Sequence, residues 1–279
     1  MLVSSISFSL MALCAKWACQ SLPSLEVVFF RSLIGTCMTL AIMFQKKIPF
    51  FGKEQHLMIL RGLSGFMALS LYFYTLGNLP IGTAVLLNYT SPILAALFAV
   101  IILKEKPGLI LLVLTLISFI GIYLLAGETG LKTWSIPVVA GLVSAVFAGV
   151  AYIMIRAVKY RESPLTIMFY FTSVSTVGSI FFLPFGFKWP GFLDWIFLAG
   201  VAVGSFYGQL WMTIAFRRAP ASVLSPLSYL TPLLSLIYGV LFFRDPLTAK
   251  QILGAFLIIG AGSAISFFGT QRKRFSRSN

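Results

Sequence analysis

Long uncharged apolar stretches, each about the length of a bilayer crossing, are separated along the chain by short charged or turn-forming segments. A helix needs about 20 apolar residues to cross about 30 Å of hydrocarbon. The stretches are continuous rather than alternating, which favours helices over the strands of a membrane barrel. The pattern predicts an all-α membrane protein with ten transmembrane helices. The expected spans are 2–19, 25–44, 57–76, 81–102, 107–126, 134–155, 164–184, 193–214, 221–242 and 249–268.

The composition narrows the class of protein. The 279 residues are 59% hydrophobic and only 10% charged, and the mean hydropathy is +0.96. Soluble domains contain about 25% charged residues, so these values exclude a cytosolic enzyme, a disordered chain and a secreted disulfide scaffold. Cys14, Cys19 and Cys37 lie in or near expected spans without metal-ligand spacing, so neither a metal site nor a disulfide framework is indicated.

The net charge of +14 is mainly a signal of orientation. Ten spans place both termini on one side of the membrane, and 14 of the 21 Lys and Arg residues fall on that side. Loops rich in Lys and Arg stay in the cytoplasm, so both termini are expected to be cytoplasmic, in a cell membrane. The 14 residues are Lys46, Lys47, Lys53, Lys104, Lys106, Arg156, Lys159, Arg161, Arg217, Arg218, Arg272, Lys273, Arg274 and Arg277.

The two halves of the chain match each other at an offset of 140 residues. Tyr89 aligns with Tyr229, and Pro92 aligns with Pro232. Each half holds five expected spans, an odd number, so the second half enters the membrane the opposite way up, as in many transporters. The chain is therefore expected to contain two inverted five-helix repeats. The expected units are residues 1–128, residues 129–271 and a basic cytoplasmic tail, residues 272–279.

Three segments of the first half form a recognisable set. They are Glu26–Arg31, Leu60–Gly62, and the run from Leu79-Pro80 through Tyr89-Thr90-Ser91-Pro92 to Lys104-Glu105-Lys106. With the ten spans and the two halves, they resemble the drug/metabolite transporter superfamily, and its EamA-type branch in particular. The resemblance implies a membrane carrier with a central cavity that works by alternating access. Because the superfamily carries amino acids, nucleotide derivatives, sugars and drugs, the resemblance is specific for the fold and weak for the substrate.

The fourth span carries small and polar residues along one helical face, and the ninth span repeats the arrangement. The first face holds Asn88 and Ser91, and the equivalent second face holds Ser228 and Thr231. Polar side chains inside a membrane usually face protein or a water-filled path, so these four residues are candidates for substrate binding. Close packing between helices uses the same residue types, and both interpretations stand.

Two further pairs of repeat-related residues lie beside these polar faces. Tyr89 and Tyr229 are candidates to bind substrate or to close opposite ends of the path, with ordinary packing as the alternative. Pro92 and Pro232 lie inside expected spans, where proline removes a backbone hydrogen bond and tends to kink the helix. Kinks at matched positions are expected to serve as hinges.

Polar or charged residues inside other spans add candidates. Gln209 is an unusual intramembrane amide, and Trp211 beside it can stack an organic substrate or a cation. Arg31 and Lys16 are candidates to bind anionic groups, although snorkelling and a structural ion pair are alternatives. Arg61 is expected at the inner interface of the membrane.

Residues for catalysis or energy conversion are scarce. The chain has one histidine, no acid in the middle of an expected span and no phosphate-binding loop, so neither an enzyme nor a cofactor is indicated. A secondary transporter of a small organic metabolite, such as an amino acid or a nucleotide derivative, is expected. The alternatives are a multidrug or toxic-compound exporter of the same fold, a channel and a membrane-embedded enzyme. The expected partners are the small-molecule substrate and the lipid bilayer, with no nucleic acid; the oligomeric state stays open.

Overall fold

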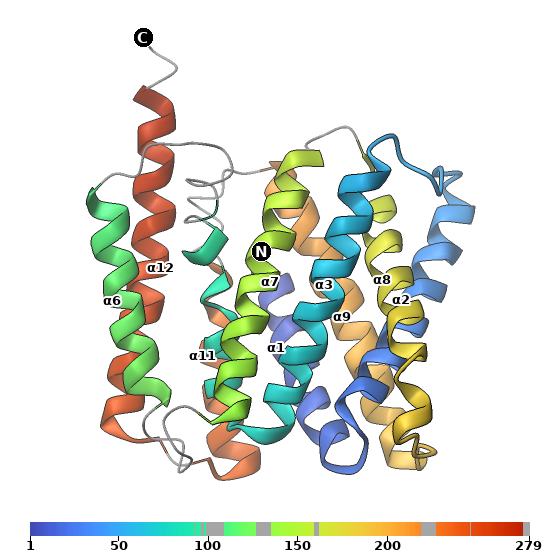
Figure 1. Ribbon diagram of the computed structural model, residues 1–279, viewed down its shortest axis with the longest axis horizontal. Helices are drawn as coiled ribbons and strands as arrows, with labels where there is room; N and C mark the ends of the chain where they lie inside the picture. The colour runs from blue at the N-terminus through green and yellow to red at the C-terminus, as the bar shows by residue number, and fades with distance from the viewer. Residues whose placement is uncertain are drawn as a thin grey trace.

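The computed structural model describes residues 1–91, 93–95, 98, 109–126, 135–158, 162–218, 227–245 and 247–275. Every regular element in these ranges is a helix, so the prediction of an all-α protein is confirmed. The helices run up and down beside one another as a bundle (Figure 1). Those of the first half are α1 (Leu2–Ser21), α2 (Ser24–Gln45), α3 (Gln55–Asn78), α4 (Ile81–Asn88) and α6 (Leu109–Ala126).

The second half repeats this order of helices. Ser163 caps the start of α8 by accepting a hydrogen bond from the Leu165 N–H, and Pro164 occupies the first helical position, where its missing N–H costs nothing. The helices are α7 (Ile136–Val158), α8 (Pro164–Ile180), the short η2 (Leu183–Phe185), α9 (Phe192–Arg218), α11 (Leu230–Tyr238), the π-helix η3 (Gly239–Phe243) and α12 (Ala249–Phe275).

The helix bounds follow the apolar stretches closely at the start of the chain. The first three helices, α1, α2 and α3, each begin and end within two residues of the expected spans. The expected end of the span 164–184 is wrong, because α8 stops at Ile180 and the chain turns into η2. Five described helices are long and apolar enough to cross a membrane, and they are α1, α2, α3, Ile136–Ile155 of α7 and Phe192–Ala215 of α9.

Contacts between the two halves occur in matched pairs. In the repeat, α1, α2, α3, α4 and α6 correspond to α7, α8, α9, α11 and α12. Helix α1 packs against α9, and the corresponding pair, α7 and α3, is also in contact. The same holds for α2 with α9 and α8 with α3, and for α1 with α11 and α7 with α4. Helices α2 and α8 pack together at one edge of the bundle, and α6 and α12 at the other (Figure 1). This pairing is the one that a two-fold relation between inverted repeats requires.

The fourth and ninth spans are both interrupted at the same repeat position. Helix α4 ends at Asn88 and the chain turns at Tyr89, while a turn at Tyr229 precedes α11. Pro232 follows the second break by three residues, and a proline there cannot donate to the carbonyl four residues earlier. Its partner Pro92 lies outside the described residues. The two interrupted helices pack against each other, which places both breaks in the centre of the bundle.

Glycines set the closest approach between α1 and α9. A Cβ atom on Gly204 would lie 2.9 Å from the backbone oxygen of Ser7, and one on Gly208 would lie 2.7 Å from the Phe8 ring. Ser4 on α1 donates a hydrogen bond of 2.7 Å to the carbonyl of Gly208. The backbones of the two halves are therefore in near contact along this seam, as small residues allow in membrane helices.

Candidate functional site

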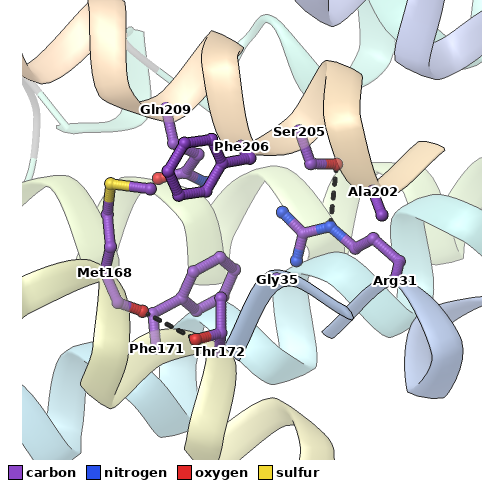
Figure 2. Close-up of a pocket in the computed structure, with 9 residues that line it drawn as sticks. All are labelled: Arg31, Gly35, Met168, Phe171, Thr172, Ala202, Ser205, Phe206 and Gln209. Carbon is purple, nitrogen blue, oxygen red and sulfur yellow. Dashed lines mark hydrogen bonds between the residues drawn. The ribbon is translucent and has the colours of Figure 1, made fainter. Parts of the chain in front are cut away.

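A pocket lies between α2 of the first half and α8 and α9 of the second half (Figure 2). Its empty space, counted with the part that is open to solvent, is about 260 Å³, and little of it is wide enough for more than a water-sized group. Its polar lining residues are Arg31, Thr172, Ser205 and Gln209, and the rest of the lining is apolar or glycine. The pocket brings together two of the predicted site residues, Arg31 and Gln209, from opposite halves.

Arg31 extends from α2 between α8 and α9 (Figure 2). Its side chain is only 3% exposed, and its Nε donates a hydrogen bond of 2.9 Å to the Ser205 hydroxyl on α9. Its Cζ lies 5.2 Å from the centroid of the Phe171 ring on α8, within the range of a cation–π contact. The nitrogen Nη1 has no hydrogen-bond partner within the described part of the chain. One arginine of the first half thus contacts both helices of the second half and keeps an unpaired donor.

Arg61 extends from α3 to the same aromatic ring. Its Cζ lies 4.4 Å from the Phe171 centroid, and its side chain is 6% exposed. Its Nε and Nη1 also lack partners among the described residues. The side chain of Arg61 therefore turns inward to the bundle, while its expected depth at the inner interface stays a prediction. Both guanidinium groups lie against one ring. Their two Cζ atoms can therefore be no farther apart than the two distances to the ring centroid, 5.2 Å and 4.4 Å, added together.

The predicted tyrosine pair lies together at the two helix breaks. The ring centroids of Tyr89 and Tyr229 are 6.1 Å apart, so the expectation that they close opposite ends of the path is wrong. The Tyr89 hydroxyl hydrogen-bonds the side chain of Thr231, and Tyr152 of α7 hydrogen-bonds Ser91. We call these residues the tyrosine cluster. Its members come from both halves of the chain, and they are Tyr89, Ser91, Tyr152, Tyr229 and Thr231.

Asn88 joins three helices at the end of α4. Its amide donates a hydrogen bond of 2.9 Å to the Ser144 hydroxyl on α7. Ser144 in turn donates a hydrogen bond of 2.8 Å to the carbonyl oxygen of Ala68 on α3. The other predicted polar face contacts α1, because Thr231 donates a hydrogen bond of 3.1 Å to the carbonyl of Ser5. Neither these residues nor the buried Ser228 lines the pocket.

Lys16 and Trp211 lie away from the pocket. The Lys16 ammonium donates a hydrogen bond of 2.8 Å to the carbonyl of Leu79, where α3 ends, because the last carbonyls of a helix lack partners in the helix itself. Asp245 lies close enough to attract it and accepts a hydrogen bond of 3.1 Å from the Ile81 N–H. Burial raises the pKa of the Asp245 carboxyl above its usual value. Trp211 is 42% exposed on the outside of α9.

Sequence reasoning missed three residues of this region: Arg61 as a buried group, Phe171 and Tyr152. The Phe171 ring contacts both guanidinium groups. Tyr152 acts electrostatically on Arg61 and hydrogen-bonds Ser91. The chain has 27 phenylalanines and 10 tyrosines, so residue type alone does not indicate which of them lie at a site. For Arg61, the signal was present, because an arginine inside an expected span calls for a partner or a polar path.

Comparison with protein families shows which family the chain belongs to. The EamA-like transporter family matches residues 1–127 and again residues 135–267. The chain belongs to this family. The EamA-like fold has ten helices in two inverted repeats, which agrees with the matched contacts between the two halves of the bundle. The chain is therefore a multi-pass membrane protein of a transporter family.

Named relatives of this EamA-like chain are transporters of small molecules. It is 31% identical over 265 residues to the pseudopaline exporter CntI of Pseudomonas aeruginosa, covering 95% of this chain and 93% of the relative. It is 25% identical over 267 residues to an S-adenosylmethionine uptake transporter of Rickettsia prowazekii, covering 93% and 88%. One solved crystal structure superposes with a TM-score of 0.63 at 17% identity, covering 97% and 98%, which supports the fold alone.

Proposed function

We propose that this chain is a secondary transporter that moves a small organic metabolite across the cell membrane by alternating access. The observation that carries the proposal is the pocket between the repeats, where Arg31 of one half and Gln209 of the other line one space. Transporters built from inverted repeats bind substrate between the repeats near the middle of the bilayer. The names of the relatives, an exporter and an uptake transporter, support a small-molecule cargo and leave both directions of transport open.

The two interrupted helices support movement at the centre of the bundle. Discontinuous helices in transporters form sites whose two sides open in turn. Here the breaks at Tyr89 and Tyr229 face each other. Residues 1–128 and 129–271 are in this proposal the two bodies that rock, with Pro232 and its mate Pro92 beside the hinges. Arg31 and Gln209 contact the substrate, and the tyrosine cluster closes the path beside it. Lys16 and Trp211 take no part in binding.

We also propose that both termini are cytoplasmic. The α2–α3 connection and the end of α12 lie at one end of the bundle (Figure 1), and both segments are rich in Lys and Arg. A reporter that is active only in the cytoplasm, fused after Asn279, is expected to be active. Activity of a periplasmic reporter at the same position would overturn this orientation.

The transport proposal is tested by comparing metabolites inside and outside cells that express the chain with those of cells carrying an empty vector. At least one small metabolite is expected to change its distribution, and its flux into proteoliposomes is expected to saturate. An unchanged distribution of all metabolites, with the protein present in the membrane, would contradict the proposal. Conversion of the metabolite by the purified protein would indicate an enzyme instead.

A further inference from the structure

The centre of the bundle holds two guanidinium groups beside one aromatic ring. From this arrangement we propose that Arg31 and Arg61 together bind an anionic group of the substrate, a carboxylate or a phosphate. The inference rests on the proposed transport function and deepens it by naming a substrate class.

Both arginines are buried, and each lies within about two helical turns of the start of its helix. Arg31 is seven residues after Ser24, and Arg61 is six residues after Gln55. With a rise of about 1.5 Å per residue, their Cα atoms lie about 10 Å and about 9 Å from opposite ends of the bundle, in a hydrocarbon layer of about 30 Å. The two side chains extend toward each other from opposite sides and reach the ring of Phe171.

The charges of these arginines are poorly compensated by the protein. Arg31 has one neutral partner, Ser205, and the two cations share the face contacts of one ring. Three of their nitrogens, Nη1 of Arg31 with Nε and Nη1 of Arg61, lack partners among the described residues. A buried charge is costly unless it is paired and fully hydrogen-bonded. The two groups are also close enough to repel each other.

The described acids do not neutralise this pair. The groups that act electrostatically on Arg31 and Arg61 are each other and Tyr152, with no carboxylate among them. The acids of the described residues lie at the ends of the bundle instead, where for example Glu26 accepts from the Lys188 N–H and Glu162 from the Glu54 N–H. In this proposal a ligand in the pocket beside Arg31 supplies the missing negative charge. Arg61 is not among the residues that line this pocket, but it lies against the ring of Phe171, which is.

The geometry also limits the kind of group. A guanidinium presents a planar fork of donors that fits the two oxygens of a carboxylate or of a phosphate. The pocket is small in this conformation, so the anionic group enters when the pocket widens during the transport cycle. Gln209 and Thr172 supply neutral polar contacts at its wall. Two unpaired cations reject a cationic substrate by repulsion.

The test measures which metabolites depend on the two arginines. Metabolite distributions are compared in cells expressing the wild type, Arg31→Gln, Arg61→Gln and the control Lys53→Gln, which removes one charge from an exposed side chain. The metabolites that the wild type redistributes are expected to carry a carboxylate or phosphate. Their transport is expected to fall about ten- to a hundred-fold in both arginine variants, the loss typical of a hydrogen bond to a charged group, and to stay within two-fold in the control.

Purified protein then distinguishes carboxylates from phosphates, because each redistributed metabolite is assayed in proteoliposomes beside its uncharged ester or dephosphorylated analogue. Membrane quantity and monodispersity of each variant exclude loss by misfolding, and Arg31→Lys, which keeps the charge but not the fork, is expected to retain part of the flux. A transported set that is neutral or cationic, or flux that survives both substitutions, overturns the anion site while leaving transport intact. If even the wild type redistributes nothing, the proposed function itself fails.

Discussion

Replacing Arg31 by methionine is expected to stabilise the unliganded protein while it abolishes transport. Methionine has a similar length and fills irregular space, so the change leaves little cavity. The variant loses the bond to Ser205, worth about 2 kcal/mol for a charged donor, and the contact with Phe171, worth about 1 kcal/mol. The variant also no longer buries a charge, and the desolvation of that charge costs the wild type several kcal/mol. The expected net stabilisation is about 1–4 kcal/mol, as found when other buried ionic groups are replaced by apolar residues.

The measurement is the apparent melting temperature of the purified protein in detergent without added metabolite. One kcal/mol corresponds to about 2–4 °C for a chain of this size class, so a rise of several degrees is expected. Lys53→Met, at an exposed position, controls for the loss of one positive charge and is expected to leave the melting temperature unchanged. A fall of several degrees for Arg31→Met would refute the reasoning, since it would mean that the guanidinium is fully paired in the unliganded protein.

Three other predictions follow from the packing and the polar network. Gly204→Val is expected to lower the yield of folded protein on size-exclusion chromatography, because a side chain there meets the Ser7 carbonyl, whereas Gly260→Val, with open space around it, is expected to behave as wild type. Asn88→Ala is expected to reduce flux at normal expression, because it removes the hydrogen bond to Ser144 that ties the interrupted α4 to α7; normal flux would show that this bond plays no part in transport. Because burial raises the pKa of the Asp245 carboxyl above its usual value in the folded protein, protonation favours folding, and that advantage is lost as pH rises through the folded pKa. Asp245→Asn is therefore expected to raise the melting temperature more at pH 8 than at a pH below the usual pKa of an aspartate.

Apolar runs of bilayer length predicted the helices well, because a membrane span is set by length and continuity. The bounds of α1, α2 and α3 agree with the expected spans within two residues. Proline positions and the repeat pointed to matched interruptions, and the breaks at Tyr89 and Tyr229 are found. The proline positions and the repeat do not give the distance between the two breaks, because that distance depends on how the two halves pack.

The pocket is less predictable for the same reason. The sequence indicated Arg31 and Gln209 as separate candidates. Only the packing of α2 against α9 places both of them in the wall of the same pocket. The burial of Arg61 was not predicted, because its position near the start of α3 gives the depth of its backbone and not the direction of its long side chain. Lys16 lies away from the pocket because its ammonium binds a free carbonyl at the end of α3. The charge pattern of the sequence does not show where such carbonyls lie.

The central claim, alternating access by a metabolite carrier, is tested most directly by counterflow in proteoliposomes. Vesicles are preloaded with an unlabelled metabolite that the wild type redistributes in cells, and uptake of the labelled metabolite is followed. The account predicts saturable uptake with a transient overshoot above equilibrium in wild-type vesicles and none in Arg31→Gln vesicles. Flux that rises linearly with concentration, without overshoot, would show a channel and contradict the account.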